Sequence, residues 1–320
     1  MIKKILGSLL LAGTACLSTA SFAAYPERPV TIIVSNPPGG PVDVMLRLVA
    51  ERLGAKWGQP VIVDNKPGAS GIISTRSIVE APADGYTLGM VVASAVTIMP
   101  FTVKQLPFDP VKDLTPISLV ARTPFIFIVP QDSPFKTWSD FVDATKARDV
   151  TIGSFTVGTA FHLVWEQTSR RAGIQALYVP SSSSGKTQND LIGGQLDIAL
   201  DAPSSAKGLI DGGRVRALAI TSPERFSGLP DVPTLNESGL DGYSSQPWIS
   251  LMGPKGLPQE RVADIRTALV DVLQEPALQE RLALLGMIPI GSTPEELAKT
   301  IADDRAVMEP LIRELDIKLQ

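Results

Sequence analysis

The sequence contains very little of the chemistry on which metalloenzymes and thiol enzymes depend. It has one cysteine and one histidine in 320 residues, and 6% of its residues are aromatic. Zinc sites and Cys–His nucleophilic sites need several such residues at set spacings, so this composition argues against both. The 29 basic side chains do not outnumber the 33 acidic ones. A net charge of −4 therefore provides no basic field for nucleic acid, and we expect no nucleic-acid partner.

Long hydrophobic runs are also absent, except at the N-terminus. Lys3 and Lys4 precede an apolar stretch over 5–17, and Ser21-Phe22-Ala23 is a small-x-small cleavage site. This order is typical of a secretory signal peptide, so we predict a signal peptide over 1–23 and a periplasmic mature protein. The compartments to which proteins are exported contain no pool of ATP or NAD, which disfavours an enzyme that depends on these cofactors.

The only cysteine, Cys16, lies inside this leader. Cleavage after Ala23 would remove it together with Lys3 and Lys4, which changes the net charge from −4 to −6. A lipoprotein anchor at Cys16 is the less favoured alternative, because Gly13 stands where a large aliphatic residue is expected.

Short β-branched runs alternate with segments of helical spacing in the rest of the chain. In the first helical segment, apolar residues fall on one stripe between Val42 and Leu53, and Gly54 is predicted to end it. Further helices are predicted at 160–171, 258–274, 276–285 and 294–312. This alternation predicts an α/β fold with parallel or mixed sheets. The predicted strands are 30–34, 61–63, 87–92, 126–129, 151–152, 177–179, 198–200 and 217–220.

Two segments, near 123–125 and 244–252, contain or adjoin turn residues and resemble crossovers, the places where the chain passes from one lobe to the other. We therefore predict a discontinuous first lobe, 24–123 plus 249–320, and an inserted second lobe, 124–248. Each lobe has the usual size of a domain.

The first candidate ligand loop follows the strand at 30–34. Asn36, Pro38, Gly39 and Gly40 form a tight turn that leads into the helix containing Val42 and Asp43. A strand, a glycine-rich turn and a helix N-terminus together present free backbone N–H groups to an anion. The same residues also suit a purely structural turn, and Asp43 is equally able to cap the helix or to order the loop.

A second loop of this kind follows the strand at 151–152. Its candidate ligand residues include small hydroxyls, and Thr159 is a predicted N-cap for the next helix. His162 lies in the first turns of that helix, and we interpret it as structural rather than catalytic. The candidates are Ser154, Phe155, Thr156, Gly158, Thr159, Ala160 and Phe161.

Two shorter turns also follow predicted strands. Ala93 and Ser94 lie at the carboxyl end of the strand at 87–92, where open α/β sheets bind ligands. Asp201 follows the strand at 198–200, where it is placed either to cap the next helix or to hydrogen-bond a ligand. The sequence contains no nucleophile elbow and no complete P-loop, so we predict no catalytic residue, no cofactor and no metal.

A series of short motifs occurs in a set order along nearly the whole mature chain. Together they resemble the Bug family, the periplasmic solute-binding receptors of tripartite tricarboxylate transporters. The motifs are 25–30 (Tyr-Pro-Glu-Arg-Pro-Val), 38–40 (Pro-Gly-Gly), 65–69 (Asn-Lys-Pro-Gly-Ala), 83–88 (Ala-Asp-Gly-Tyr-Thr-Leu), 108–114 (Phe-Asp-Pro-Val-Lys-Asp-Leu), 116–120, 191–197, 214–222 and 229–234.

The resemblance implies a type II periplasmic-binding-protein fold, with mixed sheets flanked by helices and a ligand cleft between two lobes. It implies a receptor that closes around a small carboxylate and delivers it to a membrane permease. In that family, the loops matching 36–42 and 154–161 grip the carboxylates largely through backbone N–H groups. We expect a monomer that is not an enzyme. Presentation of the ligand to a sensor kinase and, less favoured, secreted hydrolysis remain alternatives.

Departures from the family pattern point to a changed ligand. Pro41 and Val42 stand where a small hydroxyl residue is usual, and Phe155 and Phe161 enter a loop that is normally rich in Gly, Asn and Ser. Aromatic side chains favour flat apolar ligands. We therefore expect an aromatic or otherwise hydrophobic mono- or dicarboxylate, unless both phenylalanines belong to the core.

Overall fold

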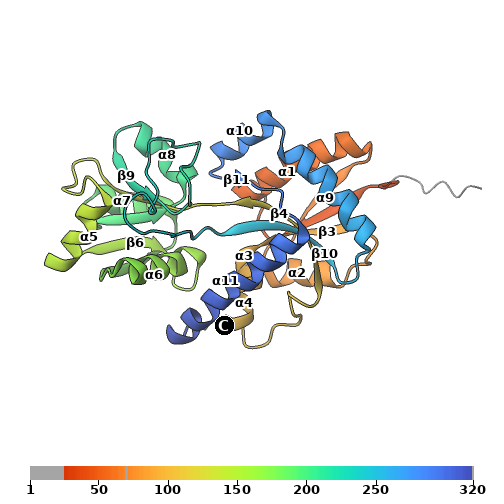
Figure 1. The fold of residues 1–320 in the computed structure, drawn as a ribbon, viewed down its shortest axis with the longest axis horizontal. Helices are drawn as coiled ribbons and strands as arrows, with labels where there is room; N and C mark the ends of the chain where they lie inside the picture. The colour runs from red at the N-terminus through yellow and green to blue at the C-terminus, as the bar shows by residue number, and fades with distance from the viewer. Residues whose placement is uncertain (1–24, 69–70, 319–320) are drawn as a thin grey trace, which may run out of the picture.

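Two separate β-sheets form the core of the protein in the computed structural model, which describes residues 25–68 and 71–318. The predicted signal peptide at 1–23, with Cys16, lies outside the described residues. Each sheet is flanked by helices on both faces and forms the centre of one lobe, and the lobes lie side by side (Figure 1). The larger sheet and its helices are called the six-stranded lobe, and the smaller sheet and its helices the five-stranded lobe.

The six-stranded sheet has the strand order β11-β4-β10-β3-β1-β2. Strand β1 pairs in parallel with β2 and β3, whereas β10 runs antiparallel to β3 and β4. Its strands are β1 (Val30–Val34), β2 (Val61–Asn65), β3 (Thr87–Val92), β4 (Leu114–Arg122), β10 (Trp248–Pro254) and β11 (Ile288–Pro289). Its helices are α1 (Pro41–Trp57), α2 (Ile72–Val79), α3 (Ala93–Thr97), α4 (Met99–Thr102), α9 (Gln259–Leu273), α10 (Pro276–Leu284) and α11 (Pro294–Glu314).

The five-stranded sheet has the order β7-β6-β8-β5-β9. Strand β6 is parallel to β7 and β8, and β5 is antiparallel to β8 and β9. Its strands are β5 (Ile126–Pro130), β6 (Thr151–Phe155), β7 (Leu177–Ser181), β8 (Ile198–Asp201) and β9 (Val215–Ile220). Its helices are α5 (Trp138–Ala147), α6 (Ala160–Ala172), α7 (Ser184–Ile192) and α8 (Pro203–Asp211).

All eight predicted strands are confirmed, but three further strands were not predicted: β4, β10 and β11. The prediction that Gly54 ends the first helix was wrong. Helix α1 continues to Trp57 and ends at Gly58, whose φ of 66° is the left-handed conformation that terminates helices. The lobe boundaries at 123/124 and 248/249 remain a prediction, although β4 and β5, and β9 and β10, belong to different sheets.

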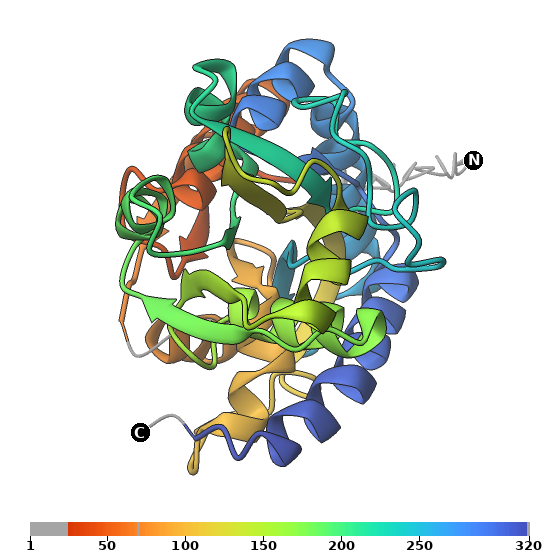
Figure 2. The same ribbon diagram turned by 90° about the vertical axis from the view of Figure 1, so that its left-hand side faces the viewer.

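Helix α11 contacts both lobes. It packs on the six-stranded sheet through Leu297 and Ile301. Farther along, Arg170 of α6 donates to Glu314 at 2.6 Å and Gln167 donates to the sulfur of Met308 at 3.4 Å. Figure 2, which views the molecule from the end carrying the five-stranded sheet, shows this dark blue helix passing along the side of the molecule. The C-terminal helix therefore connects the two lobes beside the crossovers.

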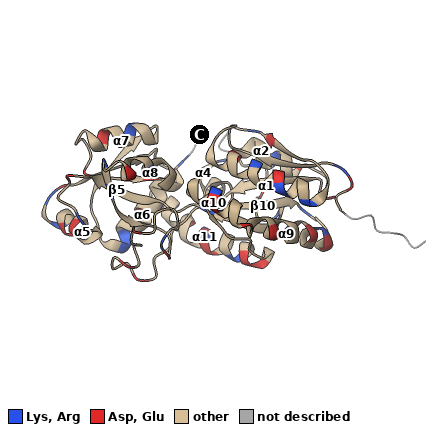
Figure 3. Ribbon diagram, turned by 90° about the horizontal axis from the view of Figure 1, so that it is seen from above, with Lys and Arg blue, Asp and Glu red and all other residues tan. Residues whose placement is uncertain are grey.

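Charged residues of both signs are scattered along the helices of both lobes (Figure 3). Most ion pairs are local and exposed, such as Lys299 with Asp303 and Arg76 with Glu80. Such pairs contribute little stability. Within 25–68 and 71–318, no helix is both long enough and apolar enough to span a bilayer.

The packing of α2 on the larger sheet depends on Gly89 in β3. A Cβ atom at this position would lie 2.0 Å from Cδ1 and 2.7 Å from Cγ1 of the buried Ile78. We expect Gly89→Ala to destabilise the protein by about 1–3 kcal/mol, because overpacking forces Ile78 off its rotamer. Thermal and urea unfolding would measure this loss.

Gly185→Ala is the matched control. Gly185 lies in α7, and a Cβ atom there would meet nothing within 4 Å. This variant should be neutral, or stabilised by up to about 1 kcal/mol through helix propensity. Equal stabilities for the two variants would contradict the packing described for Gly89.

Candidate functional site

The candidate loops lie where the two lobes face each other. Strands β1 and β3 end at the edge of their sheet where α1 and α3 begin, and β6 and β8 end where α6 and α8 begin. Parallel neighbours bring their carboxyl ends to the same edge of a sheet. The chain crosses between the sheets at this same edge, from β4 to β5 and from the β9 side back to β10.

One cavity joins predicted residues from both lobes. Its volume is about 330 Å³, and Ser94, Ile98 and Met99 line it from the six-stranded lobe. Thr156, Val157, Gly158, Thr159 and Ala160 line it from the five-stranded lobe. The structure therefore brings together five of the predicted ligand residues, which come from segments more than 60 positions apart in the chain.

A smaller cavity of about 110 Å³ adjoins the first, and Ala93, Ser94 and Ala160 are among its lining residues. It is also lined by polar residues that sequence reasoning missed, among them Arg122, Gln246 and Asp304. Arg122 carried one usable signal, because it is a charged residue directly after the buried run 117–121. Gln246 and Asp304 carried none.

The loop between β1 and α1 is organised by the carboxylate of Asp43, which is 2% exposed. Its Oδ2 accepts from the Gly39 N–H at 2.9 Å and from Arg47 Nε at 3.0 Å, and its Oδ1 accepts from Asn65 Nδ2 at 2.8 Å. Asn65 Nδ2 also donates to the Asn36 carbonyl at 2.9 Å. Asp43 therefore orders the loop, and Gly40 rather than Asp43 is the N-cap of α1.

The first turn of α1 keeps amide donors available. No side chain caps it, and Pro41 at its first position supplies no N–H. The N–H groups of Val42 and Asp43 therefore stand at the positive end of the helix dipole. Asn36, Pro38, Gly39, Gly40 and Val42 do not line the two cavities above.

The β6–α6 loop is ordered by its own hydroxyl and imidazole groups. Thr159 is the N-cap of α6, as predicted, and its Oγ1 accepts from the His162 N–H at 3.5 Å. The imidazole of His162 is buried, and its Nδ1 accepts from the Gly158 N–H at 3.4 Å. The imidazole therefore holds the loop that lines the cleft cavity.

Comparison with known proteins identifies this two-lobed arrangement. Residues 45–317 match the family model of the tripartite tricarboxylate transporter family receptor. The chain belongs to this family. It is 32% identical to the protein BugT of Bordetella pertussis over 317 residues, which cover 95% of this chain and 96% of BugT.

Solved structures agree with this assignment. The periplasmic binding protein BugD is 31% identical, with a TM-score of 0.71, covering 92% of this chain and all of BugD. Rpa4515 of R. palustris, solved with adipate, is 28% identical, with a TM-score of 0.74, covering 90% of this chain and 97% of that one. The resemblance to Bug receptors and the predicted periplasmic-binding-protein fold are therefore confirmed, and the family is one of solute-binding receptors.

In this family member, the predicted residues Phe155 and Phe161 form a row of rings with Phe125, which follows the first crossover. Phe161 stacks on Phe125 with ring centroids 3.8 Å apart and planes at 11°. Phe155 lies against Phe161 at 4.4 Å. Phe125 belongs to the core of the five-stranded lobe, whereas Phe155 and Phe161 are half-buried. The row of rings thus extends from the buried Phe125 to the half-buried Phe155 in the loop.

Two other predicted residues are engaged inside the five-stranded lobe. The buried Ser154 hydroxyl donates to the Leu200 carbonyl at 2.8 Å. Asp201 is 1% exposed and accepts from Ser184 Oγ at 2.6 Å and Gln188 Nε2 at 2.8 Å. Burial raises the pKa of Asp201, although these hydrogen bonds oppose the rise. Asp201 joins α7 to β8, and Ala202 is the N-cap of α8.

Metal ligation was not expected from the composition. Among residues 25–68 and 71–318, no three His, Cys, Asp or Glu side chains are grouped in a way that could hold a metal ion.

Asp43→Asn tests the organisation of the β1–α1 loop. Burial alone would raise the pKa of Asp43, but the hydrogen bonds from Arg47, Asn65 and Gly39 lower it to about 2. The ionised carboxylate therefore stabilises the fold above about pH 4, and this contribution is lost as the pH falls towards 2. We expect the free energy of unfolding of the variant to be about 1–3 kcal/mol lower at neutral pH. Its stability should also fall less steeply than that of the wild type between about pH 4 and 2. Urea unfolding between pH 2 and 7 measures both effects.

Asp64→Asn is the control for this experiment. Asp64 lies in β2 with an exposed carboxylate 3.5 Å from Lys66, a pair that contributes little. A loss of stability in Asp64→Asn as large as in Asp43→Asn would contradict the organising role of Asp43.

His162→Gln tests the β6–α6 loop. Burial lowers the pKa of His162, and the Glu166 carboxylate, 3.6 Å from Nε2, only partly opposes this. The folded state thus binds fewer protons than the unfolded state below about pH 6.5, so stability falls as the pH drops. Protonation of Nδ1 also removes the acceptor for Gly158. The wild type should lose thermal stability between pH 7 and 5 more steeply than His162→Gln, and parallel curves would contradict the role of the imidazole.

Proposed function

We propose that this protein captures a small carboxylate between its two lobes and delivers it to the membrane permease of a tripartite tricarboxylate transporter. One observation supports the proposal beyond family membership: Ser94 of one lobe and the β6–α6 loop of the other, which were predicted separately as ligand-binding, line a single cavity. The predicted signal peptide supports a periplasmic location. We propose that one lobe comprises residues 24–123 plus 249–320 and the other residues 124–248. We also propose that the protein acts as a monomer.

The carboxylate would be held mainly by backbone amides. The N-terminus of α1 has no side-chain cap, and in α6 the cap reaches only the His162 N–H. The remaining amides of the first turn of α6, which begins at the cavity, can donate to an anion, helped by the positive end of the helix dipole, whereas the first turn of α1 lines neither cavity. Such donors bind a carboxylate without the desolvation of a second charge. An acidic protein can therefore bind an acid by this arrangement.

The half-buried ring of Phe155 favours a ligand with an apolar body. It lies in the loop that lines the cleft cavity, and its partner Phe161 is fixed by stacking on Phe125. Adipate, which Rpa4515 was solved with, also joins carboxylates to an apolar chain. We propose an aromatic or aliphatic mono- or dicarboxylate as the transported ligand.

Ser94→Phe tests the cleft. Ser94 lines both interlobe cavities, so a phenyl ring at this position should occupy the ligand space. We expect the affinity for adipate and benzoate, measured by calorimetry, to fall at least about tenfold, since the ring excludes the ligand body. Ala160→Leu, on the facing lobe, should act in the same direction.

Ser139→Phe is the control, because Ser139 is exposed at the start of α5 and lines neither cavity. Unfolding midpoints show whether each variant is folded. Tight binding of a carboxylate that both Ser94→Phe and Ala160→Leu leave unchanged would place the ligand elsewhere and overturn this proposal.

A further inference from the structure

A third interlobe cavity lies beside the crossovers, away from the predicted ligand loops. Its volume is about 540 Å³, within the range of small-molecule sites. Residues 222–227 line it from the five-stranded lobe, and α10 and β11 line it from the six-stranded lobe through Gln279, Ala283 and Ile288. None of the sixteen residues predicted for the ligand cleft lines it.

Three polar residues of this cavity lie on neighbouring chain segments. Arg122 ends β4, and the adjacent Thr123 N–H donates to the Pro247 carbonyl at 2.8 Å, beside Gln246. The Ser245 N–H donates to the Thr221 carbonyl at 3.3 Å, beside Ser222. The crossovers therefore hold Arg122, Ser222 and Gln246 together, and all three side chains line the cavity.

Two of these side chains carry buried polar atoms without a partner in the described part of the chain. Ser222 is 1% and Gln246 7% exposed, yet Ser222 Oγ and Gln246 Oε1 have no hydrogen-bond partner there. Buried polar atoms are rarely left in this state, because the lost hydrogen bonds with water are not replaced. No described carboxylate lies within 4.0 Å of the Arg122 guanidinium, although the charge of Asp304 acts on it from the smaller cleft cavity. Asp304, which also lines the smaller cleft cavity, accepts instead from Trp248 Nε1 at 2.6 Å.

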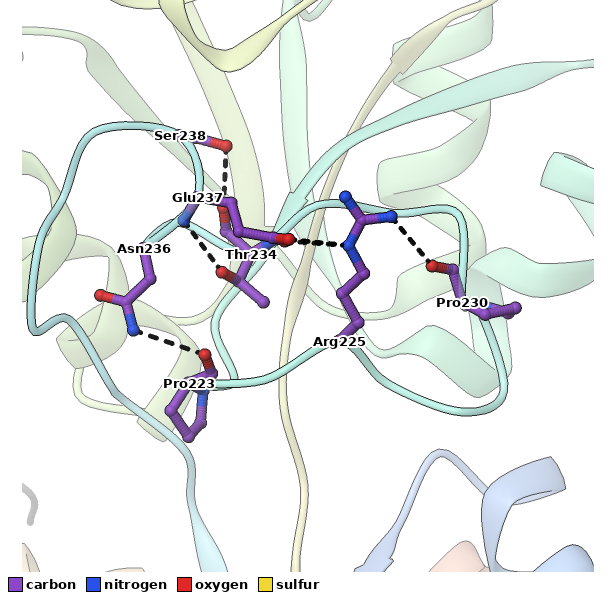
Figure 4. A network of polar contacts seen from close by, with 7 residues as sticks. All are labelled: Pro223, Arg225, Pro230, Thr234, Asn236, Glu237 and Ser238. Atoms are coloured by element: carbon purple, nitrogen blue, oxygen red, sulfur yellow. Dashed lines mark hydrogen bonds and ion pairs between the residues drawn. The ribbon is translucent and has the colours of Figure 1, made fainter.

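The wall formed by residues 222–227 is held by hydrogen bonds to residues 230–237. Figure 4 shows Arg225 bound to Glu237 and to the Pro230 carbonyl, and Asn236 bound to the Pro223 carbonyl. Arg225 Nε lies 2.9 Å from Glu237 Oε1, so its charge is already paired. Arg122 therefore remains the cation available to a ligand in this cavity, and Glu224, on the rim, is exposed.

We propose that this cavity is a second binding site, for a small 2-hydroxycarboxylate with an apolar body. The guanidinium of Arg122 and the hydroxyl of Ser222 bind the carboxylate, and Gln246 Oε1 accepts from the ligand hydroxyl. Phe226, Met287 and Ile288 contact the apolar body. An amino group in place of the hydroxyl would be repelled by Arg122. Arg122 and Gln246 also line the smaller cleft cavity, whereas Ser222 lines only this one, so Ser222 distinguishes the two sites.

The hydroxyl requirement can be tested with mandelate and phenylacetate, which differ only in that group. Calorimetry should show mandelate binding at least about fivefold more tightly, which corresponds to one hydrogen bond. Ser222→Ala should weaken mandelate binding about tenfold, and Gln246→Leu should remove the preference over phenylacetate. Ser139→Ala, at an exposed serine remote from the cavity, should change neither affinity.

Ser94→Phe separates the two sites. Ser94 lines the cleft but not this cavity, so the variant should lose adipate and benzoate while keeping mandelate. Mandelate binding that Ser222→Ala leaves unchanged and Ser94→Phe abolishes would overturn the second site while supporting the cleft. Equal affinities of the folded wild type for mandelate and phenylacetate would also overturn it.

Discussion

The two chain crossings between the sheets are the constraint on which the rest of the structure depends. Thr221, which is 0% exposed, pairs with Phe125 twice: its N–H donates to the Phe125 carbonyl at 2.9 Å, and its Oγ1 accepts from the Phe125 N–H at 2.8 Å. Thr123 and Pro247 add a second link at 2.8 Å. Within the described residues the chain passes between the two sheets at these crossings, and a hinge movement of one lobe would bend the chain there. The crossings therefore determine which surfaces of the two lobes meet.

The ligand chemistry follows from this arrangement. Helix α3 of one lobe and helix α6 of the other begin beside the same cavities, which Ala93, Ser94 and Ala160 line. Asp43 and His162 are not placed to act on a ligand themselves. They hold the two loops, one through an ionised carboxylate and the other through a neutral imidazole. Both groups must be deprotonated to hold their loops, so acid weakens both loops and neutral pH preserves them.

The sequence predicted the regular elements well where one physical signal dominated. The eight predicted strands are β-branched runs, and α6 begins at its predicted threonine cap. Strands β4 and β10 were missed because each contains a fully buried serine, Ser118 or Ser250, that interrupts the apolar pattern. Their hydroxyls bind the carbonyls of Ser292 and Val91, which are distant in the chain. Gly54 resembled a helix stop, but its φ is not left-handed, and Gly58 has the conformation that ends a helix.

By itself, the sequence showed too few cysteines and histidines for thiol or metal chemistry. It also determined the α/β alternation and the two loops with free backbone amides. Each of these depends on residues within about a dozen positions, so a local pattern can reveal it. Only the tertiary structure decided that Ser94 faces Ala160 and that Arg122, Ser222 and Gln246 share a cavity. These groups are separated by up to 124 positions in the chain. They meet because the two crossing segments hydrogen-bond to each other. No local period encodes such a contact, since it arises from the packing of the two lobes.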